Sequence, residues 1–348
     1  MWRAALAMIM VTVPATAQEP RMSSTAPIVI AHRGASGERP EHTLAAYTLA
    51  IEQGADFIEP DLVMTKDGVL VARHENDITD TTDVASRPEF RDRKTTKVID
   101  GAKHNGWFTE DFTLAELKTL RAKERLPLMR RGNKAYDGQF EVPTLREVIA
   151  LAKSASAQTG RTIGIYPETK HPTYFASIGL AMEAVLVAEL KAAGWDRADA
   201  PVFIQSFEVN NLKALKQLTD VPLIQLLAGA GAPADNAQPS YAAMATPDGL
   251  RAIAAYAAGI GPQKEMVVAN DGTVTPLVAD AHAAGLKVHP WTFRAENYFL
   301  PSALRRGINP AGHGDIEAEI ARHLAAGVDG FFTDYPYHGA QARDRHSR

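Results

Sequence analysis

Short runs of β-branched and other apolar residues alternate with longer, alanine-rich segments whose apolar positions recur at helical spacing. This alternation is typical of βα units that build a parallel sheet. Eight such strands are the number that a closed (β/α)8 barrel, the TIM-type α/β fold, requires. The expected strands are Ile28–Ala31, Phe57–Val63, Thr162–Glu168, Pro201–Ser206, Pro222–Leu227, the weaker Ala258–Ile260, Lys287–Thr292 and Gly330–Thr333.

Amphipathic helices fit between these strands, and several end at a glycine that can form a left-handed cap: Gly54, Gly194, Gly259, Gly285 and Gly327. A doubly wound open sheet is the competing architecture. Its odds are lowered because the chain has no glycine-rich loop of the P-loop or dinucleotide type. The expected helices are Thr43–Gln53, Thr144–Ala157, Ser177–Ala193, Glu208–Gln217, Pro247–Ala257, Pro276–Ala284 and Asp315–Ala326.

One segment, about 75–141, departs from this alternation. Its composition is polar and mixed in charge, and only Leu114–Leu120 is clearly helical in pattern. An ordinary βα loop is far shorter, so we predict a small inserted subdomain after the second strand region, lying over the barrel mouth. A partly disordered surface excursion is the alternative.

The N-terminus has the layout of a secretory signal peptide. Arg3 supplies a positive charge, residues 4–13 are an apolar run, and Ala15-Thr16-Ala17 ends it with small residues. We predict a signal peptide at 1–17 with cleavage before Gln18, and a barrel domain at 18–348. The alternative is an N-terminal core helix or membrane anchor, but the run is well short of the roughly 20 residues that cross a bilayer.

Composition narrows the compartment and the partners. The 348 residues include no cysteine, which excludes disulfides, a thiolate nucleophile and a cysteine-ligated zinc site. Export without disulfides fits a Gram-negative periplasm, so we expect a periplasmic or secreted protein. The net charge of −4 gives no reason to expect nucleic acid, and no later segment is long and uncharged enough to span a membrane. Small polar or anionic substrates remain, and the oligomeric state stays open.

Carboxylates stand where barrel strands should end, which is where barrel active sites form. Glu59 and Asp61 end the second strand two residues apart, on one face, and Glu168 ends the third. Three carboxylates in one mouth would repel each other unless a cation neutralised them. Oxygen-only ligands select a hard ion, so we predict one divalent cation, Ca²⁺ or Mg²⁺.

Histidines and basic residues occupy the same strand ends. His32 and Arg33 follow the first strand, His74 follows the apolar run at 69–72, and Lys170 follows the third strand. Histidines can act as general acid and base near neutral pH, and the two cations suit a phosphate. These groups together describe phosphoryl transfer at a metal-assisted site.

Ten short motifs occur along the chain: Ala31-His32-Arg33-Gly34-Ala35, Arg39-Pro40-Glu41-His42-Thr43, Ile58-Glu59-Pro60-Asp61-Leu62, Thr65-Lys66-Asp67-Gly68, Val142-Pro143-Thr144-Leu145, Tyr166-Pro167-Glu168-Thr169-Lys170, Gln205-Ser206-Phe207, Gly259-Ile260-Gly261-Pro262, His289-Pro290-Trp291-Thr292 and Gly330-Phe331-Phe332-Thr333-Asp334-Tyr335-Pro336. By these motifs and their order the chain resembles the glycerophosphodiester phosphodiesterases, and within them the periplasmic bacterial branch that uses calcium.

The resemblance implies a role for each candidate. It makes His32 and His74 the catalytic acid/base pair, puts Arg33 and Lys170 on the phosphate, and puts Glu59, Asp61 and Glu168 on a metal for which calcium is favoured. It suggests that Phe207 and Trp291 pack against the glycerol carbons, although both could be core aromatics. Glu41 and Gln205 are expected to contact these groups and orient them. Asp334 could belong to the site, or it could stabilise a backbone turn before Pro336.

The sequence departs from the family at two points shortly after His74. Glu75 stands where the family usually has Asp, and the usual Leu-Asp-Arg-Thr-Thr run appears as Ile78-Thr79-Asp80-Thr81-Thr82. The first change relocates a carboxylate. The second removes a basic residue near the mouth.

The expected function is hydrolysis of glycerophosphodiesters, such as glycerophosphocholine or glycerophosphoethanolamine, to sn-glycerol 3-phosphate and an alcohol. One alternative is a phospholipase D-like activity on lysophospholipids or sphingolipids, which predicts an exposed apolar patch at the mouth. Another is a non-catalytic phosphodiester-binding or surface protein, which would have lost a group needed for turnover. A sugar isomerase would leave the two strand-end cations unexplained.

Overall fold

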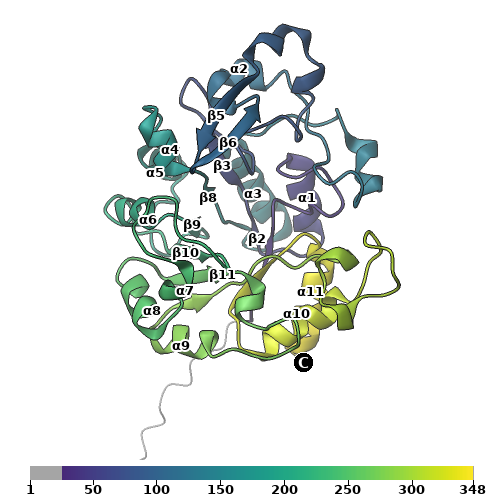
Figure 1. The fold of residues 1–348 in the computed structure, drawn as a ribbon, viewed down its shortest axis with the longest axis vertical. Coiled ribbons are helices and arrows are strands. Elements are labelled where there is room, and N and C mark those ends of the chain that lie inside the picture. The colour runs from purple at the N-terminus through teal and green to yellow at the C-terminus, as the bar shows by residue number, and fades with distance from the viewer. Residues whose placement is uncertain (1–25, 348) are drawn as a thin grey trace, which may run out of the picture.

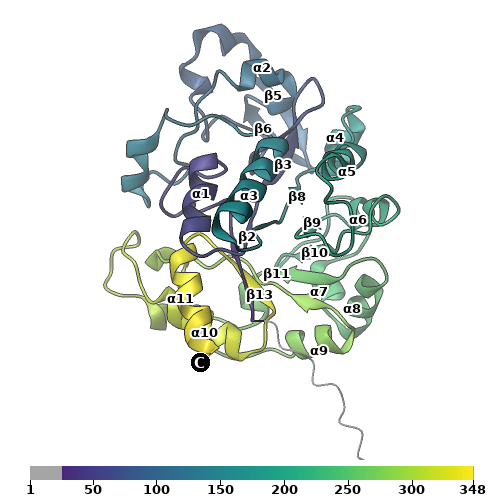
Figure 2. The same cartoon turned by 180° about the vertical axis from the view of Figure 1, so that it is seen from behind.

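The computed structural model of the chain describes residues 26–347. Within them a ring of parallel strands is enclosed by helices (Figures 1 and 2). The predicted signal peptide, 1–17, and its cleavage site lie outside the described residues. The strands are β1 (Ile28–Ala31), β2 (Phe57–Ile58), β3 (Asp61–Met64), β4 (Leu70–Ala72), β5 (Thr95–Ile99), β6 (Ala102–Gly106), β7 (Gly164–Ile165), β8 (Glu168–Thr169), β9 (Ile204–Ser206), β10 (Leu223–Leu227), β11 (Gly259–Pro262), β12 (Lys287–Val288) and β13 (Gly330–Thr333).

The strands close into the predicted barrel. One sheet runs β13-β1-β2-β7 and the other runs β12-β11-β10-β9-β8-β3-β4. Because β2 and β3 follow each other directly, as do β7 and β8, each pair occupies one position in the ring. Beyond β12, the Phe293 amide donates to the Phe332 carbonyl at 2.8 Å and joins the ring to β13. The pairings around the ring are parallel, and only β4 adds to β3 in the antiparallel sense.

Two of the predicted strands are interrupted, and in both a proline stands at the break. Phe57–Val63 divides at Pro60 into β2 and β3, and Thr162–Glu168 divides at Pro167 into β7 and β8. Proline has no amide hydrogen to donate to a ladder. The predictions of two unbroken strands were therefore wrong. Each break puts a glutamate, Glu59 or Glu168, next to the proline at the barrel mouth.

The helices mostly follow the expected pattern, with two corrections. Ser177–Ala193 is not one helix, because Gly179 at φ +81° separates α4 from α5. Gly259 lies inside β11 and caps no helix. The helices are α1 (Leu44–Glu52), α2 (Leu114–Leu117), α3 (Leu145–Thr159), α4 (Pro172–Ser177), α5 (Glu183–Ala192), α6 (Val209–Leu215), α7 (Tyr241–Met244), α8 (Pro247–Ala254), α9 (Leu277–Ala283), α10 (Ile316–Ala325) and α11 (Pro336–His346).

Residues 75–141 contribute no strand to the barrel. They form the antiparallel hairpin β5–β6, the short helix α2 and several 3-10 turns, a lobe at one end of the molecule in Figure 1. The apolar side chains of the lobe extend the larger core of the molecule: Phe90 and Phe112 stack edge to face at 5.0 Å, and both belong with buried Trp107 to that core. Its hairpin turn, at Asp100 and Gly101, is left-handed. Through Asp100 this turn contacts His171, at the carboxyl end of the third strand position.

The interior of the barrel is apolar below its mouth. Ile30, Tyr166, Ile224 and Phe332, one from each of four strand positions, form a buried cluster separate from the larger core. The larger core lies between the strands and the surrounding helices. A TIM barrel is filled by such layers of side chains, which confines polar chemistry to the strand ends.

Candidate active site

A cavity of about 170 Å³ lies at the carboxyl ends of the strands. It brings together nine of the residues singled out in the sequence, from five strand positions of the barrel. Asp61 and Glu41 lie just behind its wall. The nine are His32, Arg33, Glu59, His74, Glu168, Lys170, Gln205, Phe207 and Trp291, and the remaining lining residues are Leu226, Thr292, Arg294 and Phe332.

The three predicted metal ligands converge. One oxygen from each of Glu59, Asp61 and Glu168 lies within 4.8 Å of the others, and all three side chains are buried. Burial, followed by repulsion from Asp61, raises the pKa of Glu168 to about 7, against the opposing effect of Lys170. Burial also raises the pKa of Glu59, and Asp61 and Glu168 add to the rise. Negative charge is concentrated here beyond what the neighbouring protein groups neutralise.

Neighbouring side chains orient these carboxylates. The side-chain amide of Gln205 donates from Nε2 to Glu59 Oε1 at 2.7 Å, and the backbone amide of Arg33 donates to Glu59 Oε2 at 3.1 Å. His42 Nε2 lies 3.1 Å from Asp61 Oδ2, while Asp61 Oδ1 is buried without a partner among the described residues. Burial alone would raise the pKa of Asp61, but His42 and Arg33 hold it below its usual value. Asp61 is therefore ionised, with one oxygen free to bind a cation.

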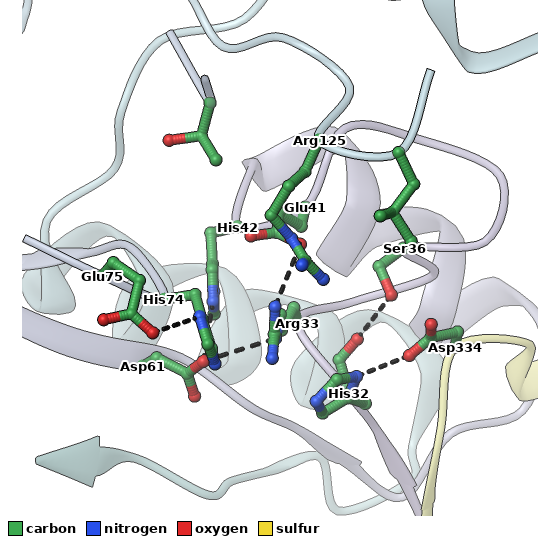
Figure 3. A network of polar contacts seen from close by, with 12 residues as sticks. His32, Arg33, Ser36, Glu41, His42, Asp61, His74, Glu75, Arg125 and Asp334 are labelled. Atoms are coloured by element: carbon green, nitrogen blue, oxygen red, sulfur yellow. Dashed lines mark hydrogen bonds and ion pairs between the residues drawn. The ribbon is translucent and has the colours of Figure 1, made fainter. Parts of the chain in front are cut away.

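His32 is held entirely by buried groups. Its Nδ1 lies 2.5 Å from Asp334 Oδ1, and the Ser36 hydroxyl donates to its backbone carbonyl at 2.8 Å (Figure 3). Asp334 Oδ2 accepts from Arg130 and, at 2.9 Å, from Arg294 Nε. Burial alone would raise the pKa of Asp334, but the two guanidinium groups hold it well below its usual value. An ionised Asp334 accepts the Nδ1 proton, which leaves His32 Nε2 with the free lone pair.

His74 is held by a more open chain of contacts. Its Nδ1 lies 2.8 Å from Glu75 Oε1, and Glu75 Oε2 lies 2.7 Å from His171 Nε2. His171 Nδ1 in turn lies 2.6 Å from Asp100 Oδ2, in the hairpin turn. Hydrogen bonds with Asp100 and Glu75 outweigh burial and raise the pKa of His171 to about 9. A charged His171 thus joins two carboxylates, and His74 is tied to the inserted lobe.

The two phosphate-binding candidates sit between the histidines and the carboxylates. Arg33, at φ +61°, donates from Nη1 to Glu41 Oε2 at 3.1 Å, and Arg125 Nε donates to the same oxygen at 2.8 Å. In Figure 3 Arg33 lies between His74 and His32. Lys170 Nζ lies 3.1 Å from Glu168 Oε1 and 3.4 Å from His74 Nε2. One oxygen of Glu41 thus accepts from both guanidinium groups.

Burial and nearby cations lower the pKa of both cavity histidines. For His32 burial is the largest cause and Arg33 the next, and the pKa falls to about 3. His74 has the same two causes, with Lys170 adding to them, and its pKa also falls to about 3. Both rings are neutral at pH 7 before an anion binds, so each offers an unprotonated Nε2.

The aromatic candidates share one wall of the cavity. Phe207 and Trp291 meet edge to face with centroids 5.7 Å apart, and the Trp291 indole donates to the Gly261 carbonyl at 2.8 Å. Both are only partly buried. An exposed aromatic face in a cavity is available to a ligand's carbon atoms.

Several residues of the site were not singled out from the sequence. Asp334 was considered only as a possible turn residue, and Glu75 only as a departure from the family. Arg130, Arg294, His171 and Asp100 were missed. The motif residue His42 carried no assigned role. The pair His171-Pro172, directly after Lys170, was the available signal for His171. Nothing in the local pattern marks Asp100 or Arg130.

Comparisons with known proteins find relatives over most of the chain. The model of the glycerophosphoryl diester phosphodiesterase family matches residues 32–338. A glycerophosphodiester phosphodiesterase of Arabidopsis thaliana is 39% identical over 331 residues, which cover 90% of this chain and 85% of the relative. A glycerophosphodiester phosphodiesterase of Haemophilus influenzae is 31% identical over 344 residues, 90% of this chain and 89% of the relative.

Solved structures show the same fold. A phosphodiesterase of Oleispira antarctica, in complex with the product sn-glycerol-3-phosphate, matches with a TM-score of 0.63 at 23% identity, over 92% of this chain and 97% of the other. A glycerophosphodiester phosphodiesterase of Agrobacterium tumefaciens matches with a TM-score of 0.58 at 20% identity, over 90% and 99%. Together with the ring of strands described above, these matches confirm the TIM-type barrel.

Proposed function

This chain belongs to the glycerophosphoryl diester phosphodiesterase family and is a phosphodiesterase, and we propose that it hydrolyses glycerophosphodiesters such as glycerophosphocholine and glycerophosphoethanolamine. The products are sn-glycerol 3-phosphate and the alcohol. The observation that carries the proposal is one cavity that combines two neutral histidines, two cations and a cluster of three carboxylates. Hydrolysis of a phosphodiester needs stabilisation of the negative charge, a proton acceptor and a proton donor, and these groups can supply all three.

Glu59, Asp61 and Glu168 would hold one divalent cation. The fit rests on the buried, unpartnered Asp61 Oδ1 and on the raised pKa of Glu168, both of which a positive ion would relieve. The donors are all oxygen, which suits a hard ion, and we propose Ca²⁺ with Mg²⁺ as the alternative. Such an ion, when bound, supplies Lewis-acid stabilisation of charge on the phosphate oxygens.

Arg33 and Lys170 bind the phosphate oxygens in this proposal. An anionic phosphate between them counters the effect by which these cations lower the histidine pKa values, so one ring can hold a proton once substrate binds. The neutral ring then accepts a proton at Nε2 from the attacking group, which is either water or the glycerol hydroxyl beside the phosphate. Attack by the glycerol hydroxyl gives a cyclic phosphate, and water must then open this ring to give glycerol 3-phosphate. The protonated ring donates from Nε2 to the leaving alkoxide. Either histidine can fill either role.

The rival functions have less support. Among the large exposed hydrophobic side chains of the described residues, only Tyr298 lines a cleft next to the cavity, so no apolar patch at the mouth favours a lipid substrate. A binding protein without turnover has no need of both histidines and all three carboxylates, and all are present. No helix of residues 26–347 is long and apolar enough to cross a membrane.

We also propose that the chain is exported and works in the periplasm or outside the cell, as in the periplasmic bacterial branch. The support is the N-terminal pattern with small residues before Gln18. Relatives from a plant and from bacteria are both similar to this chain, so the branch rests on that pattern and on the resemblance carried by Pro40-Glu41-His42-Thr43 and Gly259-Ile260-Gly261-Pro262. N-terminal sequencing of protein from an expressing bacterium would test it, and an intact Met1 would contradict it.

The test of the activity is release of glycerol 3-phosphate from glycerophosphocholine by purified protein lacking 1–17. The protein is stripped with a chelator and given Ca²⁺ or Mg²⁺ separately. We expect activity to vanish on chelation and to return with Ca²⁺. Return with Mg²⁺ alone would correct the metal, and no product with either ion from folded protein would overturn the proposal.

A further inference from the structure

A second cleft of about 340 Å³ opens beside the catalytic cavity. The two share Glu168, Lys170 and Phe207 as wall residues. Lys170, the phosphate-binding candidate, is therefore common to both, and a substituent on a phosphate at Lys170 lies next to this cleft. Its far wall includes Asp100, from the hairpin turn of the inserted lobe, and Glu208, from the start of α6.

Glu208 carries an oxygen that no protein group satisfies. The residue is 3% exposed, and its Oε2 accepts from the Thr173 amide at 3.2 Å and from the Thr173 hydroxyl. Its Oε1 is buried and has no partner among the described residues. A buried acceptor left unpaired is costly, and a carboxylate more so. The site is therefore suited to a ligand that is positively charged.

The charges around Glu208 point the same way. Burial is the largest cause that raises its pKa to about 7, and repulsion from Asp100 and Asp235 contributes to that rise, so a positive charge beside Glu208 would favour its ionised form. The cations on this wall are already paired, Lys170 with Glu168 and His171 with Glu75 and Asp100. In residues 26–347 the carboxylates close enough to hold a small metal ion are Glu59, Asp61 and Glu168, not these.

Aromatic rings complete the cleft. Phe207 and Tyr241 both line it and meet edge to face, with centroids 6.1 Å apart. Aromatic faces attract alkylammonium groups, which have a low charge density and an apolar surface. The neighbouring cleft on the other side of Trp291 instead presents three cationic side chains, Lys264, Arg294 and Arg305, against one carboxylate, Glu265, and its excess positive charge would disfavour such a group.

We propose that this cleft binds the alcohol portion of the substrate and selects alcohols that carry an ammonium group, with Glu208 as the charge partner and Phe207 and Tyr241 as the aromatic wall. The inference rests on the proposed function, because it assigns the leaving alcohol of that reaction to one side of the cavity. It predicts that the esters of choline and ethanolamine are better substrates than the ester of glycerol.

The first test uses the unmodified protein and two competing ligands. Choline and 3,3-dimethylbutan-1-ol have the same shape and differ in one positive charge. We expect choline to inhibit hydrolysis at a concentration about tenfold lower than its uncharged analogue, as one cation–π and ion-pair contact would give. Equal inhibition, or none by choline at concentrations where the analogue inhibits, would overturn the inference.

The second test is the substitution Glu208→Gln, with Glu265→Gln as the matched control. Glu265 lines the cleft on the other side of the cavity, so the control removes the same charge from the wrong place. The readout is the ratio of kcat/KM for glycerophosphocholine to that for glycerophosphoglycerol. We expect this ratio to fall about tenfold in Glu208→Gln. It should stay the same in the control.

The outcomes separate the two proposals. If folded wild-type protein cleaves neither ester with Ca²⁺ or Mg²⁺, the proposed function is wrong and the cleft assignment fails with it. If both esters are cleaved but Glu208→Gln leaves their ratio unchanged, only the cleft assignment is wrong. If Glu208→Gln does not fold, the comparison of choline with its uncharged analogue decides on its own.

Discussion

The two histidines of the cavity are oriented in the same way by very different surroundings. Each has a carboxylate at Nδ1, Asp334 for His32 and Glu75 for His74. The Asp334 side chain is 2% exposed and is neutralised by two guanidinium groups, whereas the Glu75 side chain is 42% exposed and is bound by His171. We call these two sets of residues the buried arm (His32 and Asp334, with Arg130 and Arg294) and the open arm (His74, Glu75 and His171). The buried arm is built into the barrel, and the open arm is exposed to solvent. Catalysis needs the orientation, but only the buried arm should also contribute strongly to stability.

The largest effect should come from removing either ring. His32→Ala and His74→Ala each delete a proton-transfer group, and we expect kcat to fall by about 10³-fold or more in both. Steady-state release of glycerol 3-phosphate measures it, and circular dichroism confirms the fold. Wild-type turnover by folded His74→Ala would remove that residue from the mechanism.

The next effect separates the two arms. Asp334→Asn leaves Arg294 without its carboxylate and Arg130 with Glu296 alone, so we expect a loss of about 3–5 kcal/mol in unfolding free energy along with a large fall in kcat. Glu75→Gln should lower kcat about tenfold, with a stability change below about 1 kcal/mol. Urea unfolding and kinetics on the same preparations give both quantities. Equal losses of stability would show that burial does not distinguish the arms.

The charge of His171 makes a pH-dependent contribution to stability. Its pKa is raised to about 9 in the folded protein, against about 6.5 when unfolded. The stabilisation is therefore fully present below about pH 6.5 and is lost as pH rises through about 9, by at most about 3 kcal/mol. Urea unfolding of wild type and His171→Gln from pH 6 to 10 checks this. A difference between them that grows with pH would contradict the sign.

The smallest effect should come from the hairpin turn. Asp100→Asn keeps a hydrogen-bond acceptor but removes the charge that helps to hold His171, and Asp100 is partly exposed. We expect kcat for a neutral ester, glycerophosphoglycerol, to fall about threefold with KM little changed. His104→Gln, on the neighbouring strand β6, is the control and should match wild type. A fall in kcat as large as that of Glu75→Gln would mean that the inserted lobe orients His74 more strongly than its exposure suggests.

Periodicity in the sequence was enough to predict the alternating strands and helices, because each pattern depends on neighbours two to four residues apart. It also placed His32, Glu59 and Lys170 at strand ends, and a closed barrel gathers strand ends automatically. It missed the breaks at Pro60 and Pro167, because the apolar positions on either side of each break keep the pattern of one strand; the prolines themselves were the signal for the interruption.

What the sequence by itself determined is therefore the barrel and the list of reactive groups at its mouth. Only the tertiary structure decided which groups orient them. Asp334 meets His32 across 302 residues, Arg130 meets Asp334 across 204, and Asp100 meets His171 across 71. No local period encodes such pairs, because they form only when the ring closes and the inserted lobe folds onto it.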